Sequence, residues 1–133
     1  MIRSIAAVLG GFLAMAIVVM IGTMAAAAAL IPGGLSTMRS GPSGAPVSSR
    51  YLAVNLTVSL LAAVLGGTLT ARIAGSNPRL HTFVLAGFVL VMSVVSARQS
   101  SGNTGGQPSW YGGVIAVIGV GGVLLGGVLL GPK

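Results

Sequence analysis

Four long apolar runs alternate with polar segments rich in glycine, proline and serine. The runs cover residues 5–30, 51–74, 80–97 and 110–130. A helix needs about 20 residues, each rising about 1.5 Å, to cross a hydrocarbon core of about 30 Å. Lipid offers the backbone no hydrogen-bond partner, and the runs lack the period-two alternation of a membrane barrel. We therefore predict four transmembrane α-helices.

The whole chain, 1–133, is predicted to form one integral membrane domain of the all-α class, a four-helix bundle with antiparallel neighbours. The third run has only 18 residues, so its helix is expected to stand nearly upright. The first run follows Arg3 and has two interpretations, a signal peptide or a retained helix. Its apolar stretch exceeds the usual signal-peptide core of about 7–15 residues, so we expect a retained helix.

Composition agrees with a membrane protein and narrows its chemistry. Of the 133 residues, 54% are hydrophobic and 5% are charged, and the mean hydropathy is +1.02. An ordinary soluble domain carries about 25% charged residues. Cysteine, aspartate and glutamate are absent, and the net charge is +7. This composition excludes disulfides, carboxylate acid–base pairs and an acid-relayed proton path, so we expect neither an enzyme nor a protein metal site.

Arginine and lysine set the predicted orientation, because cytoplasmic loops of bacterial inner-membrane proteins carry an excess of these cations. An N-in, C-in multi-pass topology places four cations inside, and three, Arg39, Arg50 and Arg98, outside. The candidate headgroup residues are Arg3, Arg72, Arg79 and Lys133 on the inner side and Tyr51, Trp110 and Tyr111 on the outer side. The inner cations form a basic rim suited to anionic lipids, and their scatter argues against nucleic-acid binding.

Glycine-rich repeats mark three of the four runs. AAVLGG occurs at 6–11 and 62–67, and LLGGVL occurs at 124–129. The glycine spacing fits no phosphate-binding loop motif. Small residues three or four apart instead let helix backbones approach closely in lipid, where hydrophobicity drives association weakly. The candidate helix-packing residues are Gly10, Gly11, Ala63, Gly66, Gly67, Ala71, Gly119, Gly122, Gly126 and Gly127.

Glycines on more than one face of the fourth run predict two kinds of contact. One is with the protein's own helices, and the other is with a partner helix, a lipid or a pigment. We expect no required cofactor, with lipid, carotenoid or chlorophyll as optional ligands.

Two polar residues in the runs each have two interpretations. His81, the only histidine, is either an interfacial polar residue, which its shallow position favours, or a haem or chlorophyll ligand. Asn55 either forms an interhelical hydrogen bond or is solvated near the membrane surface.

Three short motifs suggest a family. They are TARIAG at 70–75, PSWY at 108–111 and LLGG at 124–127. On these motifs the last two-thirds of the chain resembles a family of uncharacterised small bacterial four-helix membrane proteins. The resemblance implies four spans and no assigned activity. Members of that family are expected to carry some acidic residues, which this sequence lacks.

The missing catalytic groups and the surplus glycine faces favour a non-catalytic accessory or structural subunit of a large bacterial membrane complex. Photosynthetic or respiratory energy-converting assemblies are the expected hosts, and larger integral membrane subunits are the expected partners. The alternative is a small oligomeric transporter or channel. The polar residues available to line its path are Asn55, Thr57, Ser59, Thr68, Thr70, Ser93 and Ser96.

Overall fold

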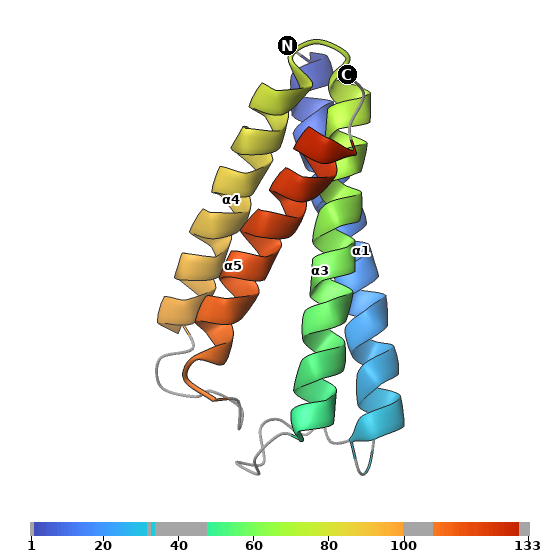
Figure 1. Cartoon of the computed structure of the whole chain (residues 1–133), viewed down its shortest axis with the longest axis vertical. Helices are drawn as coiled ribbons and strands as arrows, with labels where there is room; N and C mark the ends of the chain where they lie inside the picture. The colour runs from blue at the N-terminus through green and yellow to red at the C-terminus, as the bar shows by residue number, and fades with distance from the viewer. Residues whose placement is uncertain (1, 32, 34–47, 100–107, 131–133) are drawn as a thin grey trace.

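The computed structural model describes residues 2–31, 33, 48–99 and 108–130, without the side chains of residues 2 and 3. This part of the chain folds into four long helices (Figure 1). They are α1 (Ile2–Leu30), α3 (Ser49–Ala74), α4 (Pro78–Gln99) and α5 (Tyr111–Leu124), the last continued by the π-helical turn η1 (Leu125–Leu129). Each of the four is long and apolar enough to cross a membrane. The predicted all-α class and multi-pass character are therefore confirmed.

Local sequence explains where α3 and α4 begin. The Ser48 hydroxyl accepts a hydrogen bond from the Tyr51 backbone N–H at 3.3 Å, so α3 begins at Ser49. Pro78 occupies the first position of α4, where its missing N–H costs no helical hydrogen bond. The tight turn before it contains Gly75 at φ 68° and Asn77 at φ 48°.

The third span corrects the prediction of a short, upright helix. α4 has 22 residues rather than 18 because it gains Pro78 at its start and extends to Gln99. At about 1.5 Å per residue this helix is about 33 Å long, which exceeds the hydrocarbon thickness of about 30 Å. Length therefore gives no reason for an upright position.

α3 is the central helix of the bundle, because its contacts with α1 and with α5 and η1 are the most extensive ones. α4 also touches the other three helices, but less extensively. Among the described residues no Cα atom of α1 lies within 8 Å of a Cα atom of α5, so the backbones of these two helices stay apart. Figure 1 shows α1 beside α3 and α4 beside α5, the two pairs converging at the end where α1 begins and η1 ends. The α3–α4 turn lies at the same end, and the pairs spread toward the opposite end.

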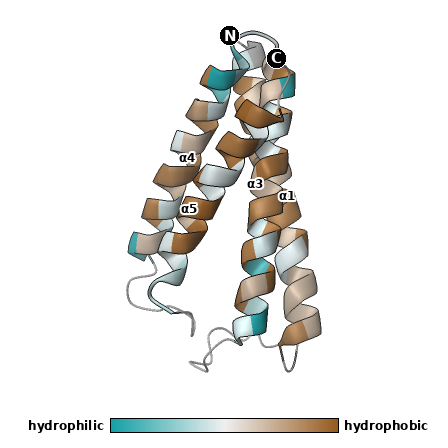
Figure 2. Cartoon of the chain, in the orientation of Figure 1, coloured by the Kyte–Doolittle hydropathy of each residue, from teal (hydrophilic) through white to brown (hydrophobic). Residues whose placement is uncertain are grey.

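Many interior positions are alanines or glycines, whereas most large apolar side chains lie on the outside. Figure 2 shows apolar positions along all four helices and hydrophilic ones mainly near their ends. The buried alanines are Ala7, Ala26, Ala27, Ala62, Ala63, Ala71, Ala74 and Ala86. The exposed side of α1 carries Ile5, Leu9, Leu13, Ile17 and Ile21 at four-residue intervals. This distribution suits a lipid solvent, in which close backbone packing replaces hydrophobic burial.

Candidate helix-packing and membrane-interface sites

Gly11 and Gly66 mark the closest approach of α1 and α3. A Cβ atom on Gly66 would lie 2.9 Å from the Gly11 carbonyl oxygen, and one on Gly11 would lie 2.7 Å from the Gly66 carbonyl oxygen. The missing Gly11 Cβ would also collide with the Thr70 hydroxyl, which is fully buried and has no hydrogen-bond partner within the described residues. The Gly11 Cα hydrogen therefore points at this oxygen, which is the geometry of a weak Cα–H···O contact.

Gly67 and Gly126 form a reciprocal pair where α3 meets the end of α5. A Cβ on Gly67 would collide with the backbone of Val123, at 2.8 Å from its carbonyl carbon. One on Gly126 would collide in the same way with Val64, also at 2.8 Å from the carbonyl carbon. Each glycine thus presents a Cα hydrogen to a carbonyl oxygen of the other helix. Only glycine at both positions permits this backbone-to-backbone contact.

A π-helical turn adds a hydrogen bond to the same junction. The Thr68 hydroxyl lies 2.8 Å from the Val64 carbonyl oxygen of its own helix and 3.1 Å from the Gly126 carbonyl oxygen in η1. A π-helical turn is wider than an α-helical one, and its altered hydrogen-bond pattern leaves carbonyl groups accessible to side chains. The fourth span was predicted as one continuous α-helix, and the structure differs: from Leu125 to Leu129 it is a π-helix.

Two further glycines fit α5 against α4. A Cβ on Gly119 would lie 3.2 Å from Val89 Cγ1, and one on Gly127 would lie 2.7 Å from Thr82 Cβ. Of the ten predicted packing residues, nine are buried, and they are Gly11, Ala63, Gly66, Gly67, Ala71, Gly119, Gly122, Gly126 and Gly127. Gly10 is half-buried, with only Ile73 Cδ1 near its Cβ position, at 3.4 Å.

Other glycines of α5 face outward. Gly112, Gly113 and Gly121 have no neighbouring atom within 4 Å of a Cβ position. Val117 lies between them on the helix surface and is 73% exposed. α5 therefore has two sets of glycines, one used within the bundle and one left on its surface.

A polar cluster ties three helices together. The Thr23 hydroxyl of α1 donates to Asn55 Oδ1 at 2.8 Å, and Asn55 Nδ2 donates to the Tyr111 hydroxyl of α5 at 2.5 Å. Asn55 belongs to α3 and is only 7% exposed. Of the two interpretations of Asn55, the structure has the interhelical hydrogen bond, and Asn55 links α1 to α5, whose backbones stay apart.

The hydroxyls proposed to line a transport path bond mainly to their own helices. Each of four donates to the carbonyl oxygen four residues earlier at 2.8–2.9 Å, and they are Thr57, Ser59, Thr68 and Ser93. Thr70 is buried against Gly11, and Ser96 is exposed. Within the described residues these groups do not converge on one polar path.

The interface residues fall into two groups. Trp110 is 54% exposed, and Arg72 and Arg79 are exposed near the α3–α4 turn. Tyr51 and Tyr111 were predicted to face the headgroups. In the structure both are instead buried in a cluster with Ala26, Ala27 and Leu52. The Tyr111 hydroxyl meets Asn55 inside the bundle, and this removes its need for water. Lys133 and the Arg3 side chain lie outside the described part.

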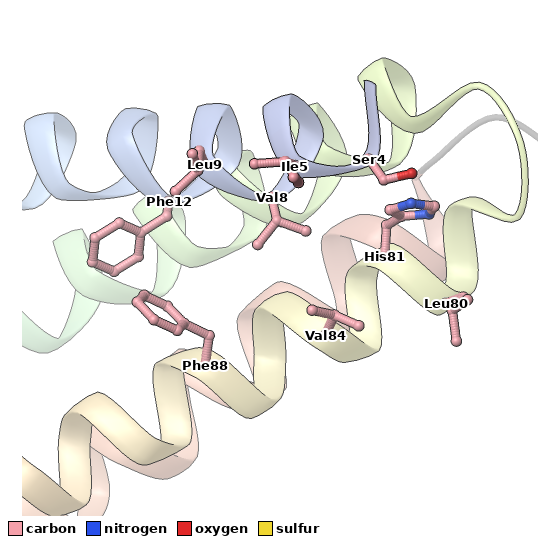
Figure 3. Close-up of a pocket in the computed structure, with 9 residues that line it drawn as sticks. All are labelled: Ser4, Ile5, Val8, Leu9, Phe12, Leu80, His81, Val84 and Phe88. Carbon is pink, nitrogen blue, oxygen red and sulfur yellow. The ribbon is translucent and has the colours of Figure 1, made fainter. Parts of the chain in front are cut away.

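His81 lies at the mouth of an apolar groove between α1 and α4 (Figure 3). The groove has a volume of about 350 Å³. Its lining residues are Ser4, Ile5, Val8, Leu9 and Phe12 from α1 and Leu80, His81, Val84 and Phe88 from α4. The Phe12 and Phe88 rings meet edge to face at the inner end, with centroids 5.0 Å apart.

His81 has one ring nitrogen already engaged. Its Nδ1 lies 3.0 Å from the Asn77 carbonyl oxygen. A carbonyl only accepts, so Nδ1 carries the hydrogen and Nε2 is left for another partner. The role of His81 as a haem or chlorophyll ligand stays a prediction, and within the described residues no group of three histidine, cysteine, aspartate or glutamate side chains gathers.

Several packing residues escaped the sequence analysis. Gly22 sits against Val58, Thr82 against Gly127, and Thr23 completes the polar cluster. None belongs to a repeated glycine motif, so only their pairing across helices distinguishes them. Comparisons of the chain with protein-family models, curated proteins and solved structures found no match.

Proposed function

We propose that the protein is a non-catalytic subunit of a larger bacterial membrane complex, which it joins through the outward face of α5. The observation that carries this proposal is the set of surface glycines Gly112, Gly113 and Gly121, around which the protein itself leaves open space. Energy-converting assemblies of the inner membrane, photosynthetic or respiratory, are the hosts we propose.

The outward face of α5 suits a helix of another subunit. Gly113, Val117 and Gly121 follow four-residue spacing, so they lie along one side of the helix. In lipid, small residues at such spacing let a second backbone approach and gain dispersion and Cα–H···O contacts. Gly126, in the turn η1 that continues α5, shows this mode of contact with the Val64 backbone of α3.

The interior supports a packing role over transport or catalysis. Asn55 uses both its amide oxygen and its amide nitrogen in hydrogen bonds to neighbouring helices. The hydroxyls of Ser59 and Ser93 are engaged by carbonyls of their own helices. A sequence without aspartate, glutamate or cysteine offers no carboxylate base or thiol nucleophile for covalent chemistry.

Matched glycine substitutions test the proposed face. We expect the wild-type chain, purified in mild detergent from its native membrane, to carry a larger integral membrane subunit in fixed stoichiometry. Gly121→Leu and Gly113→Leu fill the α5 face and should abolish that association while leaving helix content unchanged. Gly87→Leu is the control, since Gly87 is equally open but lies on α4.

Equal association of all three variants would contradict the α5 face. Purification of the wild-type chain as a homo-oligomer that conducts ions in a bilayer would contradict the subunit role. It would favour the transporter alternative.

We also propose an N-in, C-in topology with antiparallel neighbouring helices, supported by Arg72 and Arg79 flanking the short α3–α4 turn. The absence of natural cysteine makes single-cysteine labelling free of background. A membrane-impermeant maleimide should label Ser109→Cys in intact spheroplasts, and Ser76→Cys only after lysis. The reverse pattern would overturn this orientation.

A further inference from the structure

We propose that the groove between α1 and α4 holds one acyl chain of an anionic phospholipid, with the phosphate headgroup at the mouth beside Ser4 and His81. The groove opens at the end of the bundle where α1 and α4 both begin (Figures 1 and 3). This site is separate from the α5 face, so either proposal can fail without the other.

The length of the groove matches one membrane leaflet. Its wall on α1 runs from Ser4 to Phe12, which is about 12 Å at about 1.5 Å per residue. One leaflet contributes about 15 Å of the hydrocarbon core. The edge-to-face contact of Phe12 and Phe88 closes the inner end of the groove, about half-way along α4. A chain that lies in the groove from its mouth therefore ends at mid-depth, as an acyl chain does.

The lining of the groove, whose volume is about 350 Å³, indicates what it can hold. The side chains along its depth, including Val8 and Val84, are aliphatic or aromatic and offer no hydrogen bond. This chemistry suits methylene groups and excludes a polar ligand from the interior.

The two polar residues of the lining, Ser4 and His81, both lie at the mouth. The Ser4 and His81 side chains face each other across it in Figure 3. Because His81 Nδ1 donates to the Asn77 carbonyl, Nε2 is available to accept from a headgroup hydroxyl, or to donate to a phosphate when the ring is protonated. Ser4 adds a hydroxyl that both donates and accepts.

Charge selects an anionic headgroup. Arg79 is exposed in the same first turn of α4 as His81, and Arg72 is exposed in the last turn of α3. The chain has no aspartate or glutamate to neutralise either cation. A lipid phosphate without a compensating amine is therefore the complementary partner, and phosphatidylglycerol, which also carries hydroxyls, is the matching probe.

A filled-groove variant tests the acyl-chain site. The full chain is purified, placed in nanodiscs of equal parts phosphatidylglycerol and phosphatidylcholine, and returned to detergent, and the retained lipid is counted by native mass spectrometry. Val84→Trp should lower retained phosphatidylglycerol at least about tenfold, the effect of excluding two buried methylene groups. Val91→Trp is the control, because Val91 lies two turns further along α4, beyond Phe88. The two positions are 53% and 58% exposed, so both tolerate the larger ring.

A charge variant tests the headgroup. Arg79→Gln should reduce the preference for phosphatidylglycerol over phosphatidylcholine by roughly fivefold, the effect of one cation at an anionic surface. Arg50→Gln, at the other end of the bundle, should leave the preference unchanged. Equal retention by Val84→Trp and Val91→Trp, or equal retention of the two lipids by the wild-type chain, would overturn the proposal. So would cross-linking that placed a second copy of the chain in the groove.

Discussion

Gly67→Ala is the sharpest test of the backbone contact between α3 and α5. The added methyl would lie 2.8 Å from the Val123 carbonyl carbon and 2.9 Å from its Cα, whereas ordinary contacts begin at 3.4 Å. To remove the clash, the methyl carbon and the Val123 carbonyl carbon must move at least 0.6 Å further apart, and the methyl carbon and the carbonyl oxygen must move apart by more. The opposing atoms are backbone, so no side-chain rotation can make room, and α3 and α5 must move apart.

The expected cost follows from two opposing terms. Overpacking of a tight interface costs about 1–3 kcal/mol, and a backbone obstacle places this site in the upper half of that range. Alanine returns up to about 1 kcal/mol through its better helix propensity. The net destabilisation is therefore about 1–2 kcal/mol, a change of about 5–30-fold in the folded-to-unfolded ratio.

Gly121→Ala is the matched control, because it has the same propensity gain and meets no atom within 4 Å. Reversible unfolding in mixed micelles titrated with dodecyl sulfate, followed by circular dichroism and by the single tryptophan, Trp110, gives both free energies. The difference between the two variants isolates the clash, and we expect about 2–3 kcal/mol. Equal unfolding midpoints would refute the close approach of α3 and α5.

The remaining predictions concern the α1 side of the bundle and use the same unfolding assay. Asn55→Ala removes the hydrogen bonds to Thr23 and Tyr111, each worth about 0.6 kcal/mol, so it should destabilise by about 1 kcal/mol. Tyr111→Phe should lower the free energy of unfolding by about half as much. Because both variants remove the same Asn55–Tyr111 hydrogen bond, the double variant should be destabilised by less than the sum of the two single variants. Full additivity of the two effects would count against the cluster. Gly22→Ala should collide with the Val58 side chain, and Val58→Ala should restore most of the lost stability, an outcome that a clash elsewhere would not produce.

The sequence predicts a candidate packing site where small residues recur at regular spacing along one helix. The motifs AAVLGG and LLGGVL are sufficient to predict Gly66, Gly67, Gly126 and Gly127 as packing residues. The structure adds the partners of these glycines, namely carbonyl oxygens, hydroxyls and side chains on other helices. Partner identity depends on the register and rotation of two helices, which a periodic pattern in one of them leaves free.

Polar residues were harder to assign than glycines. Asn55 had two interpretations because its depth alone does not reveal whether a hydrogen-bond partner lies opposite. Tyr111 was expected at the headgroups, as aromatics near span ends usually are, but the amide of Asn55 draws its hydroxyl inward. The groove at His81 depends on the spacing between α1 and α4, which are separated in sequence by the whole of α3.

The linear chain by itself determined that this is a helical membrane protein without carboxylates or thiols, because hydropathy, span length and composition are local quantities. Tertiary structure alone decided which glycines pack against other helices inside the bundle and which lie on the outer surface of α5. It also decided that α3 is central, that Asn55 bridges three helices, and that a groove one leaflet deep opens between α1 and α4. The physical reason is that contacts between helices depend on how each helix is rotated and shifted against the next. Apolar runs of similar composition allow many such arrangements.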